Sequence, residues 1–179
     1  MLWAFARLED RVDPLMDAIA PAARPNLYEF TSQELGITAW SCAKLMIFDK
    51  PLRSAIASAA LTRLTEFAAQ NLSNMVWACA ILVWNDEPLL HAIAAESRPR
   101  ILTSSSAFDA QGLANIAWSF ALLTFHDSPM FEAISSAALR HLVFLSRVEQ
   151  QEVYALLWAS WRATESEAFF LDEAFGETQ

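Results

Sequence analysis

The side chains best suited to carry chemistry in this chain are two amides at matched positions. Asn74 and Asn115 each lie three residues before a tryptophan, within stretches otherwise rich in Ala, Leu and Ile. A carboxamide donates and accepts hydrogen bonds at once, so it can pair with the edge of a nucleobase. The same amides could instead bond to backbone groups at a junction between helices, and the sequence leaves both interpretations open.

Further polar candidates lie on the same predicted helices or at the ends of the helices that follow. The candidates on the first helices are Asn71, Glu34, Ser41, Lys44 and Ser119. A second, mostly basic set lies 23 residues after successive tryptophans and includes Arg63, Arg100 and His141. Basic side chains spaced one per repeat can follow a phosphate backbone, and equally they can stabilise the C-terminal end of a helix.

No group of residues predicts catalysis, a cofactor or a metal site. The three histidines fall at unrelated positions of the repeat, and none of the three glycines belongs to a phosphate-binding loop. Cys42 and Cys79 lack a Cys-x-x-Cys or Cys/His spacing, so they are expected to be small buried packing residues. A disulfide between them is the remaining alternative. We therefore expect a binding protein and not an enzyme.

The elements that must position these side chains are set by an internal repeat. Five tryptophans lie at intervals of 37, 37, 41 and 40 residues: Trp3, Trp40, Trp77, Trp118 and Trp158. A glutamine precedes the last four by seven residues: Gln33, Gln70, Gln111 and Gln151. Self-similarity with a period of 37–41 residues predicts an all-α protein, an α-solenoid of stacked antiparallel helix pairs.

Each repeat carries the start signals of two helices. The first helix is expected to begin at a capping residue, as in the Thr31–Glu34 capping box and at Asp109. The second is expected to begin at Asp-x-Pro, because proline suits the first turn of a helix. An alanine three residues after each tryptophan of the first four repeats lets a neighbouring helix approach closely. The tryptophan supplies a large apolar contact area.

The repeat divides the chain into an array and an acidic end. We expect a helical repeat array over residues 1–163 and an acidic C-terminal segment, a degenerate second helix or tail, over 164–179. The predicted units are a partial unit at 1–29, units at 30–66, 67–107 and 108–147, and an atypical unit at 148–163. The partial unit begins within a first helix, which favours a fragment of a longer array.

Composition limits the kinds of partner. The chain has 179 residues, is 55% hydrophobic and carries a net charge of −9, so its charge alone does not predict a nucleic-acid interface. The longest apolar run, residues 75–84, is too short to span a bilayer, and we expect no membrane segment. The chain contains no recognisable targeting segment.

The repeat resembles that of a known family. The pattern Phe-x-x-Gln-x-Leu-x-Asn-x-x-Trp-x-x-Ala-x-Leu fits residues 67–82 and 108–123 best. It is similar to the octotricopeptide (OPR) repeat and to the helical region of FAST-kinase-like and RAP-domain proteins, over roughly residues 1–163. The resemblance implies a protein of the mitochondrion or chloroplast. It also implies binding to single-stranded organellar RNA, with a role in RNA processing, stability or translation.

Two functions from different classes follow from these observations. In the first, polar side chains of the first helices read bases and basic side chains contact phosphate. In the second, the stacked helices form a scaffold for a protein partner. The resemblance favours RNA, whereas the acidic balance of the chain favours the scaffold.

Overall fold

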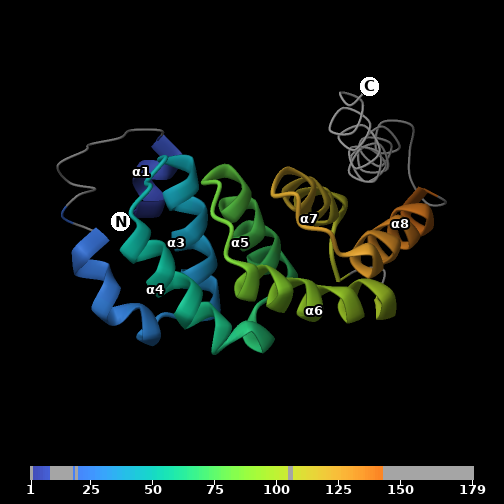
Figure 1. Cartoon of the computed structure of the whole chain (residues 1–179), viewed down its shortest axis with the longest axis horizontal. Coiled ribbons are helices and arrows are strands. Elements are labelled where there is room, and N and C mark those ends of the chain that lie inside the picture. Colours follow the sequence, from blue (N-terminus) through green and yellow to red (C-terminus); the bar gives the residue numbers. More distant parts are fainter. Residues whose placement is uncertain (1, 9–17, 19, 105–106, 143–179) are drawn as a thin grey trace, which may run out of the picture.

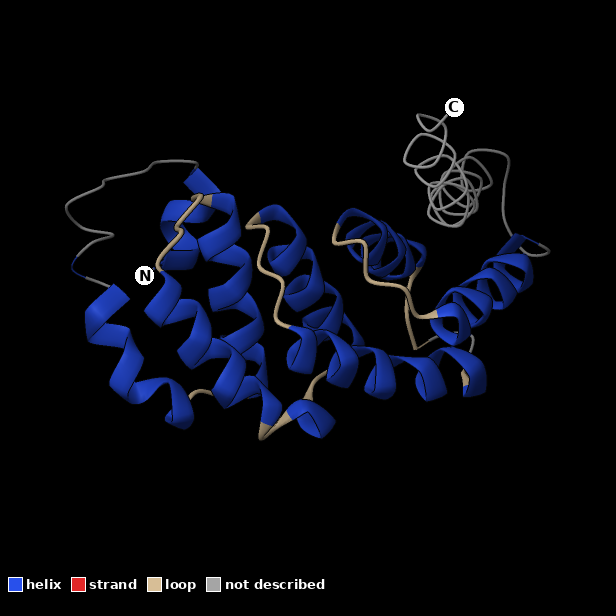
Figure 2. Ribbon diagram, in the orientation of Figure 1, coloured by secondary structure: helices blue, strands red, loops and turns tan. Residues whose placement is uncertain are grey.

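The chain folds into helices throughout the part that the structure describes. A computed structural model describes residues 2–8, 18, 20–104 and 107–142 (Figures 1 and 2). Its α-helices are α1 (Leu2–Leu8), α3 (Ser32–Lys44), α4 (Lys50–Leu61), α5 (Ala69–Ile81), α6 (Glu87–Thr103), α7 (Ala110–Leu122) and α8 (Ser128–Leu142). Two short 3₁₀ helices are η1 (Arg24–Glu29) and η2 (Leu64–Glu66). The all-α prediction is confirmed for these residues, while the predicted segments 148–163 and 164–179 lie outside them.

The helices form two series, and within each series successive helices pack against each other. We call α1, α3, α5 and α7 the first helices, and α4, α6 and α8 the second helices. Among the first helices, α5 packs against both α3 and α7, and α3 also packs against α1 (Figure 1). Among the second helices, α6 packs against both α4 and α8. The two helices of the pairs α3–α4, α5–α6 and α7–α8 also contact each other.

The first helices begin where their capping residues predict. The Thr31 hydroxyl accepts a hydrogen bond from the Glu34 backbone N–H, and the Glu34 carboxylate accepts one from the Thr31 N–H at 2.8 Å. The Asp109 carboxylate caps α7 by accepting from the Gly112 N–H at 2.7 Å. Helix α5 differs from both, because its N-cap residue Ala68 has no side chain that can accept.

The second helices begin at the predicted Asp-x-Pro sequences. The carboxylates of Asp49, Asp86 and Asp127 each accept a hydrogen bond from the backbone N–H three residues further on. These bonds satisfy N–H groups that have no partner within the helix, and the negative charge suits the positive end of the helix dipole.

The turn between the two helices of a repeat is built in the same way at three places. Met46, Val83 and Thr124 adopt φ of 53°, 47° and 51°, in the left-handed region. After α3, the Ile47 N–H donates to the Cys42 carbonyl at 2.8 Å, and α5 and α7 end with the corresponding bond. This pattern is a Schellman ending, which turns the chain sharply from one helix towards the next.

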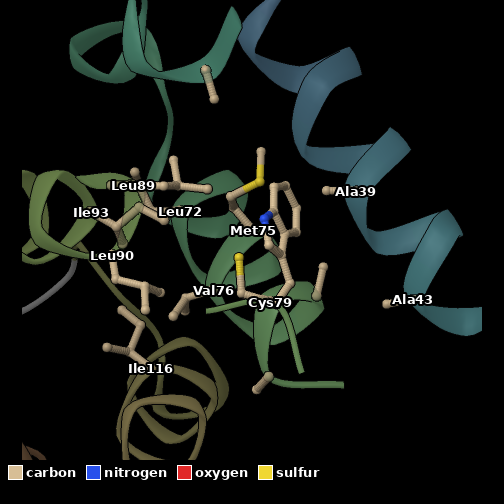
Figure 3. Close-up of a cluster of buried hydrophobic side chains, with 14 of the residues drawn as sticks. Ala39, Ala43, Leu72, Met75, Val76, Cys79, Leu89, Leu90, Ile93 and Ile116 are labelled. Atoms are coloured by element: carbon tan, nitrogen blue, oxygen red, sulfur yellow. The ribbon is translucent and has the colours of Figure 1, made fainter. Parts of the chain in front are cut away.

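The core fills the space between first and second helices. Around α5, Leu72, Val76 and Cys79 lie near the side chains of Leu90 and Ile116 from its neighbours (Figure 3). Cys42 and Cys79 are buried free thiols, as predicted, and burial raises the pKa of Cys42 to about 12. None of the helices that the structure describes is long and apolar enough to cross a membrane.

Candidate functional site

A hollow of about 340 Å³ opens between the N-terminal halves of α5 and α7. From α5 it is lined by Ala69, Gln70, Ser73 and Asn74. From α7 and the segment before it, the lining residues are Ala107, Phe108, Asp109, Gln111, Gly112 and Asn115. The two amides singled out in the sequence therefore line one hollow, although they are 41 residues apart.

Gly112 lies where α5 and α7 approach closely beside this hollow. A Cβ at residue 112 would lie 3.1 Å from the Ser73 hydroxyl oxygen, and that hydroxyl donates to the Gly112 carbonyl at 3.3 Å. In the contact between α3 and α5, the corresponding positions are occupied by Gly36 and Asn71. Asn71 is buried there. In both contacts a glycine of one helix thus faces a side chain of the next; α3 supplies the glycine in the first contact, and α7 supplies it in the second.

The amides of the hollow are not used by the fold. Asn74 and Asn115 are half-buried, and Gln70 and Gln111 are exposed. Among the residues that the structure describes, none forms a hydrogen bond with any of these four side chains. The alternative in which Asn74 and Asn115 bond to backbone groups at the junction is therefore not seen in this part of the chain.

The lining suits a flat ligand with a polar edge. Four carboxamides offer donors and acceptors, while Phe108 and neighbouring alanines supply apolar contact. One oxygen of the Asp109 carboxylate is already occupied by the Gly112 N–H, which leaves the other as an acceptor. An unpaired nucleobase combines an apolar face with an edge of donors and acceptors, so its chemistry matches that of the hollow.

Three other predicted contact residues are buried. Asn71 packs against Gly36 in the contact between α3 and α5. The Ser41 hydroxyl donates to the Ile37 carbonyl of its own helix at 2.7 Å, and Ser119 is buried in α7. The physical reason is the helical step of 100° per residue, which turns these positions towards the neighbouring first helix.

The remaining predicted residues of α3 are exposed, and one has a structural role. Glu34 forms the capping box, and hydrogen bonds from Thr31 lower the pKa of its carboxyl group. Lys44 is exposed in the last turn of α3. His141 lies in α8, and its side chain is outside what the structure describes.

The two predicted arginines hold the ends of a unit together. Arg63 donates from Nη1 to the Phe30 carbonyl at 2.7 Å and pairs through Nη2 with Glu66, also at 2.7 Å. Arg100 makes the corresponding bond to the Phe67 carbonyl. Both guanidinium groups therefore connect the end of a second helix to the start of the first helix in the same predicted unit. Sequence analysis did not reveal this role, because each bond joins residues that are 33 apart along the chain.

Of the repeated tryptophans, the structure describes Trp3, Trp40, Trp77 and Trp118, and none of these four is fully buried. Trp40 and Trp77 are partly buried against the core, whereas Trp118 is 39% and Trp3 is 52% exposed. The prediction that tryptophan supplies apolar contact area is confirmed for Trp40 and Trp77. The fully buried position is the leucine five residues earlier: Leu35, Leu72 and Leu113.

Comparison with known protein families gives a match over most of the chain. The family model of RESC6, the RNA-editing substrate-binding complex 6 protein, matches residues 1–167. The chain belongs to the RESC6 family. No curated protein matches the chain. The matched residues include both helices that line the hollow. RNA editing is a form of RNA processing, so the family match agrees at that level with the resemblance to RNA-associated helical proteins.

Proposed function

We propose that this RESC6-family chain binds single-stranded RNA, with an unpaired base in the hollow between α5 and α7. One observation carries the proposal: Asn74 and Asn115, at matched repeat positions, line the same hollow without a hydrogen bond from the described residues. Their amides would pair with the base edge, while Phe108 and the alanines contact its apolar face. The proposed role is reversible binding within an RNA-editing complex, without a catalytic step.

The distribution of charge is compatible with this role. The residues that the structure describes contain ten acidic and nine basic side chains, although the whole chain carries −9. Most of the negative charge therefore belongs to residues outside the described helices. The described part of the chain is close to neutral as a whole and does not impose the general repulsion that the net charge suggests.

The proposal includes the architecture and location that go with the resemblance. We infer a solenoid of antiparallel helix pairs related to the octotricopeptide repeat, since α5 packs against both α3 and α7. A location in an organelle belongs to the same proposal, and the family match favours the mitochondrion over the chloroplast.

Paired asparagine substitutions test the hollow. In the full chain, Asn74→Ala with Asn115→Ala should weaken binding to a pool of unstructured RNA by about tenfold or more, because two sets of base contacts are lost. The matched control is Asn26→Ala with Asn85→Ala, since both asparagines are exposed and lie outside the lining of the hollow. Fluorescence anisotropy at several salt concentrations measures the affinity. Wild-type affinity in the Asn74/Asn115 variant, or no RNA binding by the wild type, would contradict the proposal.

A protein-binding scaffold is the second candidate, and the turns supply an observation in its favour. Met46, Phe48 and Val83 expose apolar side chains where first helices lead into second helices. Binding of a protein through such residues should depend little on salt, whereas RNA binding weakens steeply as counterions are released. The same anisotropy titrations over several salt concentrations, repeated with purified protein components of the complex, distinguish the two functions by how strongly each affinity depends on salt.

A further inference from the structure

The glutamine that recurs seven residues before a tryptophan has no visible role in the fold at the three positions that the structure describes. Gln33, Gln70 and Gln111 are all exposed, and none forms a hydrogen bond among the described residues. The tryptophan seven residues later is also accessible to solvent in each of these units. A side chain that is repeated without a structural contact points to a ligand that follows the repeat.

These residues lie on one face of the first helices. Four positions of each first helix fall within about 60° of each other around the helix axis. They are the tryptophan, the positions seven and three residues before it, and the position four residues after it. We name this surface the amide–tryptophan face. Its members are Trp3 and Arg7 in α1; Gln33, Ile37, Trp40 and Lys44 in α3; Gln70, Asn74, Trp77 and Ile81 in α5; and Gln111, Asn115, Trp118 and Leu122 in α7.

Burial separates this face sharply from its surroundings. None of its fourteen members is buried. The residues directly before and after each tryptophan of α3, α5 and α7 are buried without exception: Ala39, Ser41, Val76, Ala78, Ala117 and Ser119. Because α3, α5 and α7 pack side by side in succession, their exposed sets form adjacent rows of one surface.

The charge of the face distinguishes it from the chain as a whole. Arg7 and Lys44 are its only charged members, and both are basic, although the chain contains 21 acidic residues. The Arg7 guanidinium lies 6.0 Å from the centre of the Trp3 ring. The fourteen positions combine aromatic rings, amides and two basic groups, a set that is complementary to bases joined by phosphates, while Asp109 is an acid in the adjoining hollow.

We propose that the amide–tryptophan face is a track for a single RNA strand, along which bases stack on successive tryptophans. The hollow between α5 and α7 is then one base-binding position on this track. The inference rests on the proposed function and extends it to α3 and its Trp40, which does not line the hollow. Stacking tolerates every base, so the track supplies affinity and the hollow supplies discrimination.

Oligonucleotide length distinguishes the track from the hollow alone. In the full chain, Trp40→Leu should weaken binding of an RNA of about 16 nucleotides roughly tenfold. It should leave the affinity for an RNA of about 4 nucleotides unchanged, because that length can be held at the hollow. Trp40→Phe should retain most of the affinity, since a smaller aromatic ring still stacks. Phe48→Leu is the control, because Phe48 is an exposed aromatic residue outside the face.

Two further readouts keep the test decisive. Long RNA should quench tryptophan fluorescence in the wild type and less in Trp40→Leu, and circular dichroism checks that each variant is folded. If Trp40→Leu fails to fold, Trp118→Leu replaces it, because Trp118 is more exposed. Unchanged affinity of the substituted protein for long RNA would overturn the track while leaving the Asn74/Asn115 result standing. Loss of a protein partner with unchanged RNA affinity would also overturn it and assign the face to protein docking.

Discussion

The contact between α3 and α5 and the contact between α5 and α7 use the same repeat positions, yet a hollow opens at the second. In the first contact Gly36 provides the space and Asn71 fills it. In the second, Ser73 takes the place of the first glycine and Gly112 takes the place of the asparagine. Two helices can therefore approach closely in either arrangement. The two contacts differ in which helix supplies the glycine, and the hollow lies beside the contact in which α7 supplies it.

The largest expected difference between the two contacts is in stability. Trp77→Ala should lower the free energy of unfolding by about 3 kcal/mol, because its ring packs against the core around α5. Trp118→Ala should cost only about 1–2 kcal/mol, since its side chain is 39% exposed. Chemical denaturation of both variants measures the two values. Equal losses would contradict the difference in tryptophan packing.

Placing the asparagine of the α3–α5 contact in the α5–α7 contact should weaken RNA binding. Gly112→Asn places in α7 the residue that α5 has at Asn71, and its side chain should displace Ser73 and Asp109 at the wall of the hollow. We expect affinity for unstructured RNA to fall about tenfold, as expected when a base loses its pocket. Gly36→Ala is the control, because it adds a Cβ at the helical glycine of the α3–α5 contact. Unchanged RNA affinity in a folded Gly112→Asn protein would show that the hollow is not the binding site.

A smaller effect is expected at the start of α5. Thr31 caps α3 and Asp109 caps α7, whereas Ala68 leaves α5 without a side-chain cap. Ala68→Ser should therefore raise the free energy of unfolding by about 0.5–1 kcal/mol with little change in RNA affinity.

The substitution Ala68→Asp tests whether bound RNA lies near the start of α5. Ala68→Asp should also stabilise α5, but it adds a negative charge next to Ala69, which lines the hollow. RNA affinity should then fall about twofold to fivefold at low salt, and the effect should shrink as salt is added. Thermal denaturation and anisotropy titrations of the two variants measure both quantities. Equal RNA affinity of Ala68→Ser and Ala68→Asp would place the RNA away from the start of α5.

The local parts of the fold could be predicted because their signals are local. The capping box of Thr31, the cap at Asp109 and the Asp-x-Pro starts each act within a few residues. Asn74 and Asn115 could be singled out for a related reason, since they occupy the same position in two repeats.

The site as a whole could not be predicted, because it depends on which side of each helix meets its neighbour. Helical periodicity places Asn71 and Asn74 on one broad polar face, but only the packing of α3 against α5 shows that Asn71 is buried. The hollow lies where Gly112 packs beside Ser73, a contact between residues 39 apart in sequence. The bond from Arg63 to Phe30 also joins distant residues, so the sequence suggested phosphate binding there as readily as a structural role.

Mapping an RNA crosslink on the full chain tests the central claim most directly. Ultraviolet irradiation of the wild-type protein with unstructured RNA containing 4-thiouridine, followed by mass spectrometry, identifies the peptides in contact with bases. The account predicts crosslinks at residues 69–74 and 107–115, on the two sides of the hollow, and their loss in Gly112→Asn. Crosslinks confined to other helices, or unchanged in the Gly112→Asn protein, would contradict it.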